Sequence, residues 1–155
     1  LLGVGRRELR PLLANALLQL GTHRAAVVCG SDGLDEVTLS GPTHVSLIRG
    51  DCLEETDWSP DQFGLAASDL APLAIDGPDS SARMIRQVLA GQPGVARDIV
   101  LMNASAALWI AGACADLPAG TARAAQAIDS GAAAELLIQL ADLSHTQTDP
   151  SPPNG

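Results

Sequence analysis

The sequence predicts an α/β fold in which helices flank a sheet, and three features of the 155-residue chain support this class. Arg24 to Cys29 forms an apolar, strand-like run that an acidic turn follows directly. Leucines ahead of this run recur at helical spacing, and the second half contains several longer segments with helical periodicity. With 46% hydrophobic and 17% charged residues, the chain is expected to form a single domain around one sizeable core.

The first expected helix lies between Glu8 and Gly21. Its leucines recur every three or four residues, and Gly21 is a natural helix end, so this segment is predicted to be a packing helix. The preceding segment, Gly3 to Gly5, has two glycines in the spacing of a dinucleotide-binding motif. However, Glu8 occupies the position of the third glycine and no strand is visible before it, so phosphate binding there is not favoured.

The strands are expected in the first half of the chain. Arg24 to Cys29 is the strongest candidate, and after the acidic turn both Val37 to Leu39 and His44 to Arg49 have strand-like composition. Arg49-Gly50-Asp51 has the composition of a turn, and it leads into a further candidate strand, Cys52 to Trp58. The last two strands therefore form a predicted hairpin.

The second half is expected to be mainly helical, with boundaries set by proline and glycine. The expected elements are a short turn over Asp61 to Phe63 after Ser59-Pro60, a loop from Ala66 to Gly77, and helices over Ser81 to Gly91, Val95 to Cys114, Pro118 to Ile128 and Ala132 to Leu143. The helix from Val95 has apolar residues on every face, which predicts burial at the centre. Asn103 and Ser105 within it are expected to be satisfied core polar groups that hold a neighbouring loop.

The end of the chain differs in composition from the rest. Residues 144–155 contain three prolines and no apolar anchor, so a disordered tail is expected after a folded region of residues 1–143.

The acidic turn contains the candidate metal ligands, Asp35 and Glu36. Ligands of open α/β sheets collect at the carboxyl ends of strands, and Gly30 and Gly33 would let the turn approach a bound ion closely. Carboxylate oxygens suit magnesium, which usually keeps several waters and completes its shell with substrate phosphates. A solvated acidic turn without a ligand is the alternative, because Asp and Gly are common turn residues.

The charge of the chain restricts its partners. With 18 acidic and 9 basic residues the formal net charge is -9, and no basic run could neutralise the phosphates of nucleic acid. The same charge would repel a sugar phosphate, so a site for such a ligand requires cations to bring it in. No nucleic-acid partner is expected.

The cysteines and histidines give no sign of a catalytic or metal centre. The three cysteines are widely separated and are expected to be reduced, mostly buried thiols: Cys29, Cys52 and Cys114. The three histidines are too scattered for a metal site or a catalytic triad and are expected on the surface: His23, His44 and His145. The sequence contains no recognisable signal peptide and no apolar run that could span a bilayer, so a cytoplasmic protein is expected and no membrane partner.

Several ordered segments resemble one family. They are Val27 to Glu36, Ser40 to Val45, Ser59 to Leu65, Val88 to Gly91, Ala96 to Ala104 and Ala127 to Ala133. Together they resemble anthranilate phosphoribosyltransferases, the second enzyme of tryptophan biosynthesis, and the similarity extends over nearly everything from Leu1 to Leu143. There are two departures. The family commonly has His where Cys29 stands, and the glycine-rich phosphate loops of its first half have no counterpart here.

The resemblance implies part of the large α/β domain of a nucleoside phosphorylase/phosphoribosyltransferase-like fold. It implies a magnesium-dependent pentosyltransferase that transfers phosphoribose from phosphoribosyl pyrophosphate to anthranilate and releases pyrophosphate. Asp35 would bind one magnesium ion and Glu36 would bridge two, with no catalytic side chain in this chain. The absence of an initiator Met before Leu1 fits a fragment, inactive alone, of roughly the C-terminal half. The substrate-binding residues and a helical homodimer interface are then expected in the missing N-terminal half.

Two alternatives remain open at this stage. A nucleoside phosphorylase or related transferase of the same fold would differ in its acceptor, and this part of the chain lacks the residues that would choose the acceptor. A non-catalytic binding relative is the second alternative. The carboxylate pair and the acidic charge argue against it.

Overall fold

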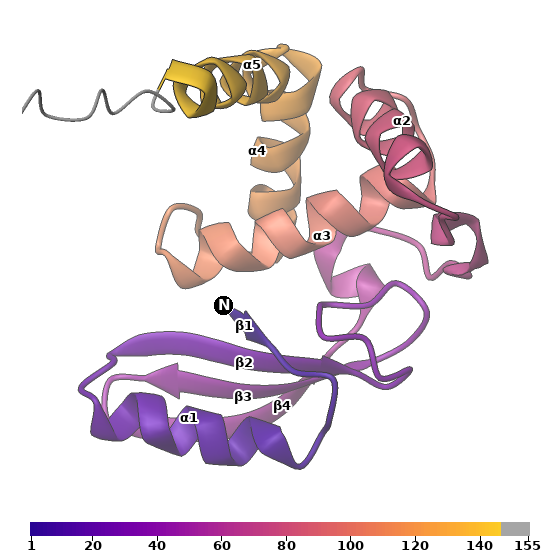
Figure 1. The fold of residues 1–155 in the computed structure, drawn as a ribbon. Helices are drawn as coiled ribbons and strands as arrows, with labels where there is room; N and C mark the ends of the chain where they lie inside the picture. The colour runs from indigo at the N-terminus through magenta and orange to yellow at the C-terminus, as the bar shows by residue number, and fades with distance from the viewer. Residues whose placement is uncertain (147–155) are drawn as a thin grey trace, which may run out of the picture.

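A four-stranded sheet organises the first half of the chain, and helices lie on both of its faces (Figure 1). The computed structural model describes residues 1–146, with side chains described to residue 144. The strands follow the order β1-β2-β3-β4, and their bounds are Leu2–Gly3, Arg24–Gly30, Thr43–Arg49 and Cys52–Trp58. β1 pairs with β2 in parallel, whereas the β2–β3 and β3–β4 pairs are antiparallel.

Helix α1, Leu9–Gln19, covers one face of the sheet (Figure 1). Alternate residues of β2 and β3 point toward α1 and form a core with its inner face. The buried residues of this core are Val4, Ala14, Ala25, Val27, Cys29 and Ile48. Arg10 is the charged member of this layer. It is only 6% exposed, and its guanidinium lies 2.6 Å from Oε2 of Glu55 on β4.

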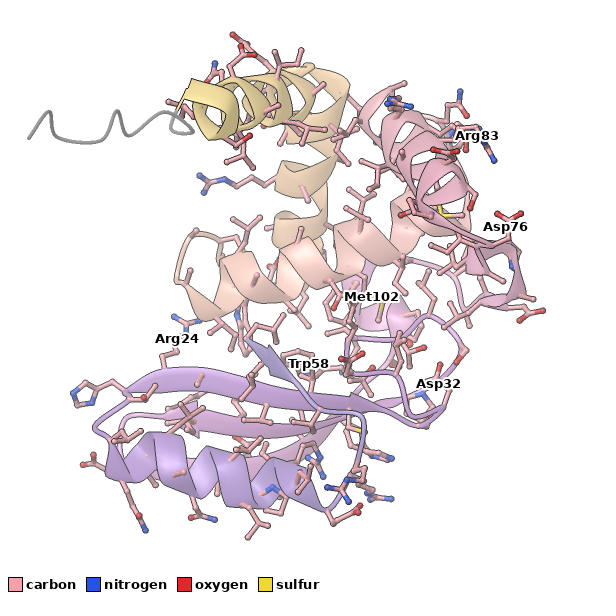
Figure 2. All side chains as sticks on the ribbon, in the orientation of Figure 1. Arg24, Asp32, Trp58, Asp76, Arg83 and Met102 are labelled. Carbon is pink, nitrogen blue, oxygen red and sulfur yellow. The ribbon has the colours of Figure 1, made fainter. Side chains whose placement is uncertain are left out.

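Helix α3, Val95–Ile110, crosses the opposite face (Figure 1). The largest buried cluster lies between this helix and the sheet and includes Val28, Val45, Leu47, Trp58, Phe63, Met102 and Ala106. Met102 is fully buried there, and Figure 2 shows it between α3 and the sheet. Burial of both faces explains why six consecutive residues of β2 are buried, since a strand covered on both sides is apolar along its length.

The remaining helices lie beyond α3, on the side away from the sheet (Figure 1). They are α2, α4 and α5, with bounds Pro78–Leu89, Leu117–Asp129 and Ala132–Thr146. A third cluster joins α2, α3 and α4 through Val88, Leu101, Ala124 and Ile128. Gly120 of α4 lies so close to Ser105 of α3 that a Cβ atom there would come within 2.6 Å of Oγ.

Most predicted elements are present. The predicted helices correspond to α1 to α5, the hairpin is formed by β3 and β4, and Pro60–Phe63 forms a short 3-10 helix that ends at Gly64. The predicted loop from Ala66 to Gly77 contains one further 3-10 turn, Ala71–Leu73. Within residues 1–146, no helix combines the length and apolar character needed to span a membrane.

Val37 to Leu39, which was predicted to be a strand, is instead a buried irregular segment. Two of its backbone amides bond to side chains, and the carbonyl oxygen of Leu39 accepts the backbone amide of Ser68 at 3.0 Å. The amide of Val37 donates to Oδ1 of Asn103, and the amide of Thr38 donates to Oγ1 of Thr43, both at 2.9 Å. The apolar composition of the segment therefore reflects burial without sheet pairing.

The expectation of mostly buried cysteines is wrong. Cys29 is buried, Cys52 is exposed and Cys114 is intermediate, although all three thiols are free. Cys52 is the first residue of β4, an edge strand that pairs only with β3, and its side chain is open to solvent.

Two of the predicted surface histidines are described by the structure. His23 is exposed, as expected. His44 is different, because its side chain is only 14% exposed and its Nδ1 lies 2.7 Å from Oδ1 of Asp57. The side chain of His145 lies outside the described residues.

Helix α5 continues to Thr146, three residues beyond the predicted boundary at Leu143. Within this extra part, the side-chain hydroxyl of Ser144 donates to the carbonyl oxygen of Ala141 at 2.7 Å. The rest of the predicted disordered tail, residues 147–155, lies outside the described residues.

Candidate metal site at the end of strand β2

The acidic turn begins where β2 ends and closes on itself through backbone hydrogen bonds. The amide of Gly30 donates to the carbonyl of Leu34 at 2.8 Å, and the amide of Gly33 donates to the carbonyl of Gly30 at 2.9 Å. Gly33 has φ of 86°, a conformation that glycine adopts without a steric penalty. The turn is therefore a defined structure at the carboxyl end of the central strand.

Asp32 holds the turn together with its carboxylate. Its Oδ1 accepts the amide of Leu34 at 3.0 Å, and its Oδ2 accepts the hydroxyls of Thr38 at 2.7 Å and Ser40 at 2.6 Å. Partial burial raises the pKa of Asp32, but the hydrogen bonds from Ser40, Thr38 and Leu34 together outweigh burial and hold the pKa below its ordinary value. Asp32 is therefore ionised at neutral pH and already occupied by protein donors.

Strand β1 packs closely against the backbone of the acidic turn at Asp35. A Cβ atom on Gly3 would overlap the carbonyl oxygen of Asp35, and the nearest atom to a Cβ on Gly5 would be the carbonyl oxygen of Gly33 at 3.7 Å. Gly3 is thus required for close approach of β1 to the acidic turn. This packing explains the glycine at position 3, whereas a side chain at position 5 would meet no close contact.

Asn103 of α3 fixes the other side of the turn. Its Oδ1 accepts the amide of Val37, and its Nδ2 donates to the carbonyl oxygens of Val37 and Ile99 at 2.9 and 3.0 Å. The side chain therefore satisfies both backbone groups of the residue that follows Glu36. The prediction that Asn103 holds a neighbouring loop is confirmed, and Ser105 likewise bonds the carbonyl of Leu117.

Asp35 and Glu36 project from this fixed backbone into solvent. Both side chains are exposed, and among the described residues neither has a hydrogen bond or an ion pair. No group of three or more His, Cys, Asp or Glu residues suitable for a metal occurs within the part of the chain that the structure describes. Two unpaired carboxylates fit magnesium, which needs few protein ligands, better than a metal that requires a complete protein cage.

The profile of the glycosyl transferase family, a/b domain, matches residues 1–134. The chain belongs to this glycosyl transferase family. It is 47% identical to the anthranilate phosphoribosyltransferase of Rhodospirillum rubrum over 140 residues. The matched residues cover 90% of this chain and 40% of the relative. The chain is 42% identical over 146 residues to the corresponding enzyme of Stenotrophomonas maltophilia, covering 94% and 43%.

Solved structures of anthranilate phosphoribosyltransferases have the same fold. Anthranilate phosphoribosyltransferase from Saccharomyces cerevisiae in complex with 4-fluoroanthranilate has a TM-score of 0.80 at 31% identity, covering 90% of this chain and 41% of that one. The Thermus thermophilus enzyme has a TM-score of 0.79 at 33% identity, covering 88% and 40%. The S. cerevisiae enzyme in complex with PRPP and Mg has a TM-score of 0.76 at 31% identity, covering 86% and 39%.

These matches confirm the predicted fold class and the resemblance to anthranilate phosphoribosyltransferases. The chain spans about 40% of the length of the curated relatives that it matches. The glycosyl transferase assignment therefore describes this segment, and the activity of a longer protein is a separate question.

The sequence alone predicts a metal site in the acidic turn of this glycosyl transferase domain, but it does not predict the groups that support the turn. The contact from Asn103 to Val37 joins residues 66 apart, and nothing local signals it. The contact of Gly3 with Asp35 is also non-local. The role of Asp32 had a local signal, because an Asp side chain often bonds the backbone amide two residues later. Cys29 lies in the core beneath α1, and its thiol donates to the carbonyl oxygen of Gly30, where the turn begins, at 3.5 Å.

Proposed function

We propose that this chain is the metal-binding α/β part of an anthranilate phosphoribosyltransferase of tryptophan biosynthesis. The observation that carries the proposal is the pair of exposed, unpaired carboxylates, Asp35 and Glu36, at the end of β2. The identity of 47% to the R. rubrum relative supports the choice of this transferase within the family. The reaction would move phosphoribose from phosphoribosyl pyrophosphate to anthranilate and release pyrophosphate.

Asp35 and Glu36 would hold magnesium ions, with Asp35 on one ion and Glu36 bridging two. The chain fixes the backbone on which these side chains stand, through Asp32 on one side and Asn103 on the other. Adjacent side chains diverge in regular structure, so an irregular turn is needed for both to reach one metal cluster. When bound, magnesium would supply positive charge that stabilises the departing pyrophosphate.

The proposed binding of phosphoribosyl pyrophosphate and Mg is supported by the S. cerevisiae enzyme in complex with PRPP and Mg. The 4-fluoroanthranilate complex of the same enzyme supports an aromatic carboxylate as acceptor. The residues that bind these substrates, a homodimer interface and a cytoplasmic location remain predictions for the longer protein.

A chimera tests the proposal in a complete enzyme. The 140 residues of the R. rubrum relative that match this chain would be replaced by the chain, and pyrophosphate release would be measured with phosphoribosyl pyrophosphate, anthranilate and magnesium. We expect magnesium-dependent turnover that depends on anthranilate. A folded chimera that binds both substrates but releases no pyrophosphate, beside an active R. rubrum parent, would contradict the proposal.

A further inference from the structure

Two arginines lie side by side at the end of the sheet opposite the acidic turn. Arg24 begins β2 and is the direct cross-strand partner of Arg49, which ends β3. Both occupy the face covered by α3, since Arg24 shares its strand parity with the core residue Ala26. Figure 2 shows Arg24 and Asp32 at opposite ends of β2. Like charges directly opposite one another destabilise a sheet, so this arrangement requires an explanation.

Trp109 of α3 contacts both arginines. The guanidinium carbon of Arg24 lies 5.3 Å from the centroid of the ring and that of Arg49 lies 5.1 Å from it, and Arg24 also donates a hydrogen bond to the carbonyl of Trp109. These contacts attract each cation to the ring and orient it. They do not neutralise either charge.

Among the residues that the structure describes, no carboxylate forms an ion pair with either arginine of the pair. The ion pairs among the described residues involve Arg10, His44 and Arg97, and neither arginine of the pair takes part in one. Acidic residues occur nearby in the sequence at Asp51 and Glu54. Both are exposed, and neither lies within ion-pair distance of the two guanidinium groups.

The two guanidinium groups line an open pocket of about 520 Å³. Its other lining residues are His23, Gly50, Trp109 and Ala115, so the described lining contains basic and neutral side chains and no acidic one. This is a local concentration of positive charge in a chain whose formal net charge is -9. A planar guanidinium presents paired N–H donors that match the oxygens of phosphate or carboxylate.

We propose that this pocket binds a small oxyanion, with Arg49 as its main ligand and Arg24 as the second donor. The bound anion would neutralise the repulsion between the two arginines and accept hydrogen bonds that the protein does not satisfy. The site lies at the opposite end of β2 from Asp35 and Glu36 and does not depend on their function.

Tryptophan fluorescence of the chain provides a direct test, since both tryptophans, Trp58 and Trp109, lie near the pocket and their ring centroids are 5.8 Å apart. Inorganic phosphate and acetate would be titrated separately at constant ionic strength and without magnesium. We expect a saturable change with at least one of these anions. Loss of charge-assisted hydrogen bonds in Arg49→Gln should weaken binding by about tenfold or more.

Arg86→Gln is the matched control. Arg86 is an exposed arginine of α2, so this variant changes the net charge by the same amount while leaving the pocket intact. Its titration should be that of the unmodified chain. Arg49→Lys keeps the charge and loses the paired donors, and it should bind with an affinity between those of the unmodified chain and Arg49→Gln.

Thermal unfolding gives a second measurement. The anion that binds should raise the melting temperature of the unmodified chain and of Arg86→Gln, with a much smaller effect on Arg49→Gln. Saturation by phosphate alone would assign a phosphate-bearing ligand, and saturation by acetate would assign a carboxylate. The proposal is overturned if neither anion gives a saturable response, or if Arg49→Gln responds as Arg86→Gln does.

Discussion

The acidic residues of one turn have different roles at the scale of single side chains. The carboxylate of Asp32 accepts hydrogen bonds from three protein donors, whereas the carboxylates of Asp35 and Glu36 accept none from the described residues. A carboxylate that already accepts protein hydrogen bonds orders the backbone, and one left unpaired remains available for a ligand. The sequence favours this backbone role for Asp32, because an Asp side chain often bonds the amide two residues later, but it does not show the bonds to Thr38 and Ser40.

Asp35→Ala and Glu36→Ala should lower turnover of the chimeric enzyme much more than they lower its stability. Both side chains are exposed, so each substitution should change the free energy of unfolding by only about 0.5 kcal/mol. Turnover across a magnesium titration, beside thermal unfolding, measures the two effects. We expect the larger loss of turnover for Glu36→Ala, since Glu36 as the proposed bridging ligand would act on both ions.

Glu54→Ala is the control for these two variants, because Glu54 is an exposed carboxylate on β4. It should retain the turnover of the unmodified chimera. The metal assignment fails if the double variant of Asp35 and Glu36 keeps this turnover at every magnesium concentration.

Asp32→Asn should destabilise the chain at neutral pH and lose this effect in acid. The folded pKa of Asp32 lies below its ordinary value of 3.8, so ionised Asp32 stabilises the fold above that value. The contribution is lost as the pH falls through the folded pKa, where both states bind the proton. Urea unfolding at pH 7 should show that Asp32→Asn lowers the free energy of unfolding by about 1 kcal/mol. This is the typical net value of one hydrogen bond, and it is kept this small for three bonds because Asp32 is exposed.

The same comparison repeated toward pH 3 tests the sign. The difference in unfolding free energy between the unmodified chain and Asp32→Asn should shrink as the pH falls below about 4. A difference that stays constant or grows in acid would show that the carboxylate does not stabilise the turn through its ionised form.

At the scale of elements, helices and long strands were predictable, and short or irregular segments were not. The hairpin of β3 and β4 and the helices have periodic apolar patterns with clear turn signals. β1 has two residues and therefore no period, and its place beside β2 depends on the close approach of Gly3 to the acidic turn. Val37 to Leu39 has the apolar composition of a strand, but its backbone bonds to Asn103 and Thr43.

Gly3→Ala should disrupt this arrangement. Its Cβ would overlap the carbonyl oxygen of Asp35, so either β1 or the acidic turn must move, at a cost of about 1–3 kcal/mol typical of overpacking. Gly5→Ala is the matched control, because its Cβ would meet its nearest atom at an ordinary 3.7 Å. Thermal unfolding of both variants measures the difference. Equal melting temperatures would mean that β1 does not hold the turn in solution.

For the whole molecule, the outer helices leave much apolar surface uncovered. On α5, Leu136 is 65% exposed and Ile138 is 63% exposed, and on α2 Ile85 is 49% exposed. Exposed apolar patches of this kind promote association. We therefore expect the isolated chain to self-associate, and sedimentation velocity over a range of concentrations measures this. The double variant Leu136→Glu and Ile138→Glu should reduce association, and a monomeric unmodified chain at every concentration would contradict the expectation.

The isolated chain should bind magnesium only weakly and have no transferase activity. Magnesium requires six oxygen ligands, of which Asp35 and Glu36 supply at most a few, and the ion normally completes its shell with water and substrate phosphates. The part of the chain that the structure describes offers no third carboxylate in a metal-binding group with these two. We expect a dissociation constant for magnesium on the order of millimolar or above, because so few of its ligands come from the protein. Calorimetric titration with magnesium alone, and then with phosphoribosyl pyrophosphate present, measures it. Micromolar binding of magnesium together with phosphoribosyl pyrophosphate would contradict this expectation, as would pyrophosphate release in the presence of anthranilate. Either result would mean that the chain binds the phosphates with residues other than those of the acidic turn.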